Sequence, residues 1–170
     1  LAPFADWHDI KGFDWTPTGG ADIDATRQLF GAATARLTQS PQRAYADNAA
    51  FAFGERSVTI ECWFRPDDAA TYQMIFWTPT LLTATGLAIY AFPNSRELRL
   101  YSLGETVTDL ICTAGLWHHI ALALDRHANS PFWSLYQDGV RAAGHPIEGA
   151  RNFTDAQWNW GSWTGASVYG

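Results

Sequence analysis

The segment Ser57–Pro66 constrains the fold of this chain more than any other stretch. Its sequence, SVTIECWFRP, alternates with period two and is rich in β-branched and aromatic residues, as is typical of a β-strand. Pro66 ends the segment, because proline cannot donate a hydrogen bond to a sheet. Trp63 falls on the face opposite Ile60, so both faces are expected to be covered, as in a two-sheet sandwich. We therefore predict that Val58–Phe64 is an interior strand paired on both edges.

Further strand-like segments follow at the spacing of about 8–12 residues that is typical of an antiparallel sandwich. Turn residues such as Pro93-Asn94-Ser95 separate them. The predicted strands are Tyr72–Trp77, Gly86–Phe92, Glu97–Leu103 and Thr106–Thr113. We expect the last of these to pair with the next strand along the chain, which carries His118 and His119. The fold class predicted from these patterns is all-β, an antiparallel two-sheet sandwich.

Sequence motifs in a fixed order identify a related family. Thr59–Pro66 reads T-I-E-x-W-F-x-P, Gly115–Ala121 reads G-x-W-H-H-I-A, and Leu135–Val140 reads L-Y-x-D-G-V. Together they resemble the laminin-G-like, concanavalin A-like jelly-roll superfamily of lectin, pentraxin-like and glucanase domains. The resemblance extends from Phe30 to Gly165 and implies a jelly-roll sandwich. It implies much less about function, because this scaffold carries adhesion, sugar binding, catalysis and purely structural roles.

The expected domain organisation has two parts. Residues 1–25 show neither helical nor strand periodicity and are predicted to form an irregular N-terminal arm, and residues 26–170 the laminin-G-like domain. Members of the family usually finish with a closing strand, which is missing after Tyr169. The start at Leu1 and this missing strand favour a part of a larger polypeptide. The sheet edge left open would be filled by a continuation of the polypeptide, by the N-terminal arm or by a strand from a neighbouring subunit.

Residues in two of these motifs are predicted to have structural roles. His118 and His119 should point to opposite faces of their strand, so they cannot ligate one ion together. Asp138 is expected to close a hairpin turn in which Gly139 takes a positive φ.

Cys62 and Cys112 fit either a disulfide or two buried free thiols.

Metal binding stays open at the level of sequence. Several members of the resembling family use calcium through loop oxygens, so the resemblance allows for calcium here. The ligands are unknown. The acidic residues among which no choice can be made are Asp47, Asp67, Asp68, Asp109 and Asp125.

No catalytic residues are predicted. Glucanases on the resembling scaffold carry Glu-x-Asp-x-Glu on one strand, and a retaining mechanism needs two carboxyl groups about 5 Å apart. Glu61 has no acidic residue at position 59 or 63, while Glu97 and Glu105 stand alone in the sequence. The sequence therefore predicts that the protein is not an enzyme, and a glycoside hydrolase is the function it supports least.

Aromatic residues are the predicted ligand-binding groups. The chain has 9 Trp, 10 Phe and 6 Tyr, and sugar rings stack their C–H faces on exposed aromatic rings. Trp160 and Trp163, together with Tyr90, are the candidates for such a platform. The alternative is that the tryptophans cap the open end of the sandwich.

Charge narrows the range of partners. The chain has 11 basic and 17 acidic residues, so it lacks the positive surface that nucleic acid requires. It has no apolar run of transmembrane length.

The function that we predict is that of a non-catalytic carbohydrate-binding or adhesion module, located extracellularly, on a cell surface or on a virion. Its expected partners are a glycan or polysaccharide and other protein chains of a larger assembly. The alternative is a structural assembly domain of a virion or surface complex.

Overall fold

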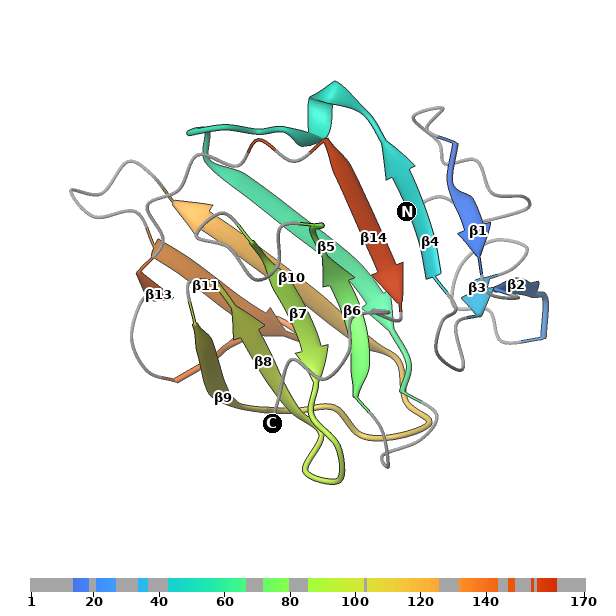
Figure 1. Ribbon diagram of the computed structural model, residues 1–170. Coiled ribbons are helices and arrows are strands. Elements are labelled where there is room, and N and C mark those ends of the chain that lie inside the picture. The colour runs from blue at the N-terminus through green and yellow to red at the C-terminus, as the bar shows by residue number, and fades with distance from the viewer. Residues whose placement is uncertain are drawn as a thin grey trace.

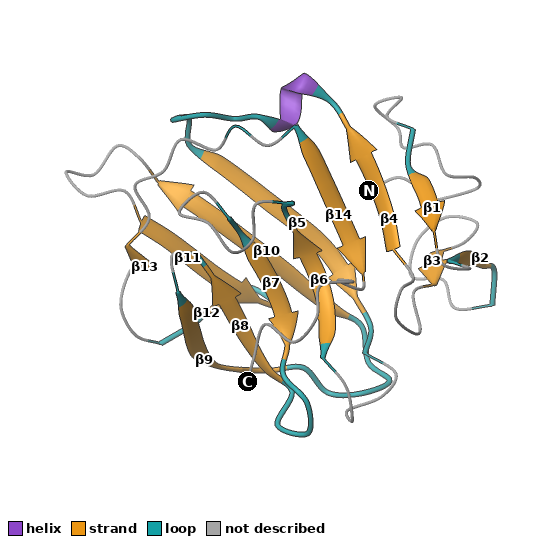
Figure 2. Cartoon of the chain, in the orientation of Figure 1, coloured by secondary structure: helices purple, strands orange, loops and turns teal. Residues whose placement is uncertain are grey.

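The computed structural model describes residues 14–18, 21–26, 34–36, 43–66, 72–79, 86–102, 104–125, 132–143, 147–148, 154 and 156–161. These residues form two antiparallel β-sheets that lie face to face, together with a small two-stranded sheet and a short 3-10 helix (Figures 1 and 2). The predicted all-β two-sheet sandwich is confirmed.

The larger sheet has seven strands, all paired antiparallel. Figure 1 shows it in front of the other sheet. Its order is β1 (Thr16–Thr18), β4 (Arg43–Asp47), β14 (Gln157–Gly161), β6 (Gln73–Trp77), β7 (Ala88–Ala91), β8 (Glu97–Tyr101) and β9 (Glu105–Ile111). The late strand β14 thus lies between the early strands β4 and β6, which is a long-range connection.

The second large sheet has five strands. Its order is β12 (Val140–Arg141), β11 (Phe132–Gln137), β10 (His118–Asp125) and β5 (Val58–Phe64), with β13 (Ile147–Glu148) also paired to β11. The two-stranded sheet joins β2 (Asp22–Asp24) to β3 (Thr34–Arg36). The 3-10 helix η1 (Ala49–Phe51) begins at Asn48, whose side chain accepts a hydrogen bond from the Ala50 amide at 2.8 Å.

Part of the expected N-terminal arm belongs to the sandwich. β1 extends the larger sheet by pairing Thr16–Thr18 with β4, and β2 pairs with β3. These residues are therefore regular strands, where the sequence predicted irregular structure. Such three-residue strands are too short to produce a periodic pattern. The boundary at residue 25 stays a prediction.

β5 is a strand, as predicted. In the part of the chain that the structure describes, β5 pairs with β10 alone, so the second neighbour that the sequence predicted is not among these residues and stays a prediction. Its outer face carries the exposed Thr59 and Glu61, and polar side chains of this kind are common on edge strands. Alternation fixes which face is buried, and it says little about how many neighbours a strand has.

β9 also has a different neighbour from the one predicted. It pairs with β8, while β10 pairs with β5 and β11 in the other sheet. The segment 112–117 therefore crosses from one sheet to the other, through a turn in which Gly115 has φ 77°. A positive φ at this position is easy only for glycine.

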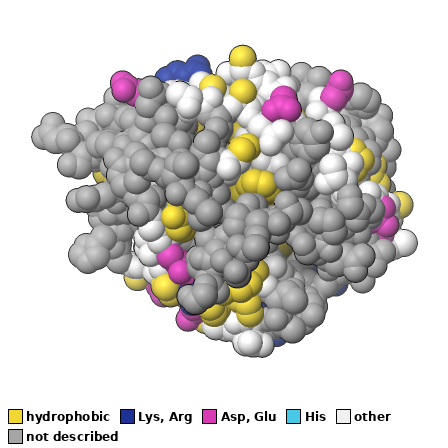
Figure 3. Space-filling model, viewed as in Figure 1, with side chains coloured by type: hydrophobic (Ala, Val, Ile, Leu, Met, Phe, Trp, Pro, Cys, Tyr) yellow, Lys and Arg dark blue, Asp and Glu magenta, His cyan; other side chains and the backbone are white. Residues whose placement is uncertain are grey.

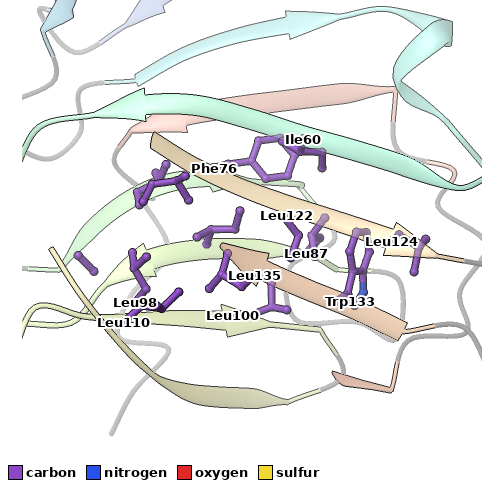
Figure 4. Packing of buried hydrophobic residues seen from close by; sticks show 14 of the residues in the cluster. Ile60, Phe76, Leu87, Leu98, Leu100, Leu110, Leu122, Leu124, Trp133 and Leu135 are labelled. Atoms are coloured by element: carbon purple, nitrogen blue, oxygen red, sulfur yellow. The ribbon is translucent and has the colours of Figure 1, made fainter. Parts of the chain in front are cut away.

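The core lies between the two large sheets (Figure 4). β10 contributes alternate residues, of which Ile120, Leu122 and Leu124 are at most 2% exposed. Leu98 and Leu100 of β8 are fully buried and belong to the same cluster. This continuous apolar layer provides most of the driving force for folding and holds both sheets rigidly.

A β-bulge in β6 decides which of its residues face outward. Met74 pairs with Tyr90 and Phe76 pairs with Ile89, so Ile75 is the extra residue. Ile75 and Phe76 both lie in the core. Because the bulge resets the alternation, Trp77 points to the outer face of the sheet together with Met74.

Candidate functional site

The outer face of the seven-stranded sheet gathers aromatic and charged side chains from β6, β7, β8, β9 and β14 and the residues next to them. Residues directly opposite each other in a sheet share a face. Tyr90 lies opposite Met74 and Arg99, and Ala88 lies opposite Trp77. We call this surface the aromatic face. Its members are Tyr72, Met74, Trp77, Ala88, Tyr90, Phe92, Glu97, Arg99, Tyr101, Glu105 and Asn159.

Tyr72 supplies an accessible ring on the aromatic face. Its side chain is exposed at 41%. Its ring lies 5.1 Å from Phe92 at 86° and 6.2 Å from Tyr90 at 58°, measured between ring centroids. Edge-to-face contacts of this kind fix the orientation of a ring. Figure 3 shows the side of the molecule seen in Figure 1, where apolar side chains reach the surface in several places with acidic side chains nearby.

A charged cluster lies next to these rings. The guanidinium carbon of Arg99 is 3.3 Å from the centroid of Phe92. Arg99 Nη2 donates to Glu97 Oε2 at 3.2 Å, and Nη1 donates to Glu105 Oε1. Burial acts to lower the pKa of Arg99, but the hydrogen bonds to Glu105 and Glu97 outweigh it and raise the pKa. The guanidinium is therefore a permanent cation held in place by a ring and two carboxylates.

The side of the aromatic face toward β14 is fixed by hydrogen bonds. Trp77 Nε1 donates to the Gly161 carbonyl at 3.2 Å, and Asn159 Nδ2 donates to the Trp77 carbonyl at 3.4 Å. Trp77 is 4% exposed and Asn159 is fully buried. These two side chains support the face rather than offer a surface.

The predicted binding residues do not form one platform. Tyr90 is fully buried, so its ring is not open to a ligand. Trp160 lies opposite Phe76, which lies opposite Ile89 in the core. Since Ile89 and Tyr90 are successive residues of one strand, they point to opposite faces. Trp160 and Tyr90 are therefore on opposite sides of the same sheet, and Trp163 lies outside the described residues.

Trp160 belongs to a second aromatic cluster at the end of the core. Its ring centroid is 6.1 Å from that of Trp15 and 5.3 Å from that of Phe76. In the same cluster, Phe51 and Trp158 stack at 4.6 Å. Trp15, in the expected N-terminal arm, is itself buried. Trp160 is half-buried. This arrangement indicates that Trp160 caps the end of the sandwich and is not an exposed platform for a sugar.

His118 and His119 lie on opposite faces of β10, as predicted. His118 is buried; its Nε2 accepts from the Thr113 amide at 2.9 Å and its Nδ1 donates to Asp138 Oδ2 at 2.7 Å. His119 points outward, with Nε2 3.5 Å from Glu61 Oε2. His118 is thus a hydrogen-bonded part of the core rather than a ligand.

Asp138 closes the β11–β12 hairpin, also as predicted. It has φ 52° and Gly139 has φ 81°, which fits a two-residue turn with positive φ at both positions. Its Oδ1 accepts from the His119 amide at 2.8 Å. Burial acts to raise the pKa of Asp138, but the hydrogen bonds from His118 and His119 outweigh it and lower the pKa.

Metal ligands and cysteines add no further site in the described residues. No group of three His, Cys, Asp or Glu side chains in this part of the chain is placed to hold a metal ion. Asp67 and Asp68 lie outside it, so calcium binding stays untested. Cys62 and Cys112 are free thiols, and burial, with the nearby negative groups, raises both pKa values to about 12.

Sequence reasoning missed Tyr72 and Arg99 as site residues. Period-two alternation through Tyr72–Trp77 would place Trp77 on the face opposite Tyr72, because the bulge is not visible in the pattern. The run Met74–Trp77, four apolar residues in succession, was the available signal that the alternation is broken. Arg99 could have been found from Glu97, which is two residues away and therefore shares its face.

Comparison with known proteins identifies the family of this chain. The sequence matches the Laminin_G_3 family, described as the concanavalin A-like lectin/glucanases superfamily, over residues 39–169. The chain therefore belongs to this superfamily, as its motifs predicted. No curated protein matches the chain.

Three solved structures are similar to the whole sandwich. Domain 4 of the extracellular arabinanase AbnA from Geobacillus stearothermophilus, in complex with arabinotriose, has a TM-score of 0.63 and 17% identity, with 91% of this chain and 77% of that one covered. Endo-β-1,4-glucuronan lyase from Trichoderma reesei has a TM-score of 0.61 and 12% identity, with 92% and 81% covered. The Bacillus licheniformis β-glucanase has 0.57 and 18%, with 98% and 85% covered. At these identities the likeness establishes the concanavalin A-like fold alone.

Among the described residues, no helix has the length and apolar character needed to cross a bilayer.

Proposed function

We propose that this chain is a non-catalytic carbohydrate-binding or adhesion domain that holds a glycan against the aromatic face. The observation that carries this proposal is the exposed ring of Tyr72, oriented by Phe92 and Tyr90 beside the charged cluster of Arg99, Glu97 and Glu105. A sugar can stack its C–H face on the ring. Its hydroxyl groups can donate to the carboxylates, which supply the few directional contacts that a binding site needs.

The fold supports this proposal by analogy. A domain of similar fold belongs to an extracellular arabinanase and was solved with arabinotriose bound. Because one fold carries many functions, this analogy raises the expectation of glycan binding without locating the site. By the same analogy we propose an extracellular location.

An assembly role is the second candidate, and one contact favours it. The Trp15 ring packs against Trp160, so this tryptophan is partly covered from within the chain, as expected if the aromatic cluster is structural. The binding roles of Trp160 and Trp163 remain predictions, and Trp160 lies on the opposite side of the sheet from the aromatic face.

Replacing Tyr72 by alanine should weaken glycan binding by about tenfold, because an aromatic contact contributes roughly 0.5–1.5 kcal/mol beyond the area it buries. A glycan array would identify the ligand, and affinity gel electrophoresis on that glycan would measure the loss. Tyr72→Phe should retain most of the binding. The matched control is Val140→Ala, at an exposed position (63%) on the other sheet.

Trp163→Ala tests the other predicted binding residue in the same assay. Loss of binding in Trp163→Ala with full binding in Tyr72→Ala would rule out the Tyr72 ring as the binding platform. An array on which the unaltered protein binds no glycan would leave the assembly role as the better account.

The protein should release no reducing sugar from arabinan or β-glucan above background. Glu97 and Glu105 both accept a hydrogen bond from the same guanidinium group, that of Arg99, so each carboxyl group is engaged with a cation. A retaining or inverting glycosidase needs one protonated carboxyl group as the general acid. Turnover that disappears in Glu105→Gln, or in Glu61→Gln, would contradict this prediction.

A further inference from the structure

The charges on the aromatic face do not balance. Arg99 supplies a single positive charge, and Glu97 and Glu105 both pair with it, so the cluster carries a net charge of −1. Asp109 does not belong to this cluster, because its Oδ1 accepts from the Ala143 amide at 2.8 Å. The chain as a whole has a formal net charge of −6. A ligand that approaches this face therefore meets a negative potential.

Arg99 is not available to reverse that potential. Its side chain is only 14% exposed, its guanidinium lies over Phe92, and both terminal nitrogens already donate to carboxylates. A uronate or sulfate group would have to compete with these two carboxylates for the guanidinium. Neutral sugars meet no such obstacle, because the partly exposed carboxylates (32% for Glu97 and 27% for Glu105) accept hydrogen bonds from hydroxyl groups.

We infer that the ligand of the aromatic face is a neutral polysaccharide, and that Glu97 and Glu105 exclude acidic ones. This inference rests on the proposed function and names the substrate class of the same site. The carboxylates act in two ways: they accept hydrogen bonds from neutral sugars, and they repel anionic groups while they occupy the arginine that would otherwise bind them.

The test compares neutral and acidic polysaccharides on the same protein. Affinity gel electrophoresis at low ionic strength would use arabinan and β-glucan as neutral probes, and polygalacturonate as the acidic probe. The unaltered protein should bind at least one neutral probe about tenfold more tightly than polygalacturonate, as expected for several like charges at short range in water. Raising the salt concentration should reduce this preference, because the repulsion is screened.

Glu105→Gln should narrow the preference for neutral over acidic polysaccharides by about threefold, since it removes one like charge and leaves Arg99 with a weaker, uncharged acceptor. The matched control is Glu61→Gln, which makes the same change of charge at a 60% exposed side chain on the other sheet. The control should leave the preference unchanged. The melting temperature of each variant would confirm that it is folded.

The possible outcomes separate the inference about neutral ligands from the proposed function. Binding of polygalacturonate as tightly as the neutral probes would overturn the inference and leave the proposed function standing. An equal narrowing in Glu61→Gln and Glu105→Gln would also overturn it, because the preference would then come from overall charge. Binding of none of the probes, followed by an empty glycan array, would overturn the proposed function itself.

Discussion

Replacing Phe76 by alanine should lower the free energy of unfolding by about 3–5 kcal/mol, the usual cost of deleting a large aromatic side chain from a core. Phe76 is fully buried. Its ring lies 5.0 Å from Trp158 and 5.3 Å from Trp160, so it joins the main core to the second aromatic cluster. The small residue would leave a cavity that the rigid sheets on either side cannot close. Urea unfolding followed by tryptophan fluorescence would measure the loss.

Two variants make the result specific. Phe76→Leu should cost less than the alanine variant, because it keeps most of the buried volume. Val140→Ala removes an apolar side chain that is 63% exposed and should change stability by less than about 0.5 kcal/mol. A cost below about 1 kcal/mol for Phe76→Ala, well under the range for such core deletions, would mean that the two clusters are not packed through this ring.

Strand positions followed from the sequence more closely than strand partners did. The predicted strands Tyr72–Trp77, Gly86–Phe92 and Thr106–Thr113 agree with β6, β7 and β9 to within two residues at each end. Alternation is a local property, so a single segment contains it. Pairing is set by connections across the chain, and the sequence therefore placed β9 beside β10 incorrectly.

The candidate site was predicted less well, for a related reason. The motifs correctly indicated the superfamily and the structural roles of His118 and Asp138. The choice of Tyr90 came from its aromatic type, and the type of a residue does not show whether its ring is covered. Tyr90 is fully buried, while Tyr72, whose ring centroid is 6.2 Å away, is exposed. The bulge at Ile75 decides which side chains of β6 share that face, and bulges leave only a weak trace in a pattern of period two.

Replacing Asp138 by alanine should lower the free energy of unfolding by about 2–4 kcal/mol. The buried His118 would lose the acceptor of its Nδ1–H, and the His119 amide would lose its own; leaving such a donor unpaired costs about 1–3 kcal/mol. Alanine at φ 52° adds about 1–2 kcal/mol of backbone strain. Asp138→Asn should cost less, because asparagine tolerates this φ and keeps the Oδ1 acceptor. A loss no greater in Asp138→Ala than in Asp138→Asn would contradict this account.

The same hairpin should make the free energy of unfolding depend on pH in the acidic range. The pKa of Asp138 in the folded protein lies below its ordinary value of 3.8, so the unfolded chain binds this proton more readily than the folded one. The stabilisation is therefore fully present above about pH 4 and is lost as the pH falls through the folded pKa. Because the carboxylate is 45% exposed, solvent screening keeps this contribution modest. Urea unfolding between pH 2 and pH 6 should show that Asp138→Asn loses less stability toward acid than the unaltered protein, since asparagine does not titrate. If the free energy of unfolding falls equally toward low pH in both proteins, the hydrogen bonds of Asp138 do not lower its pKa.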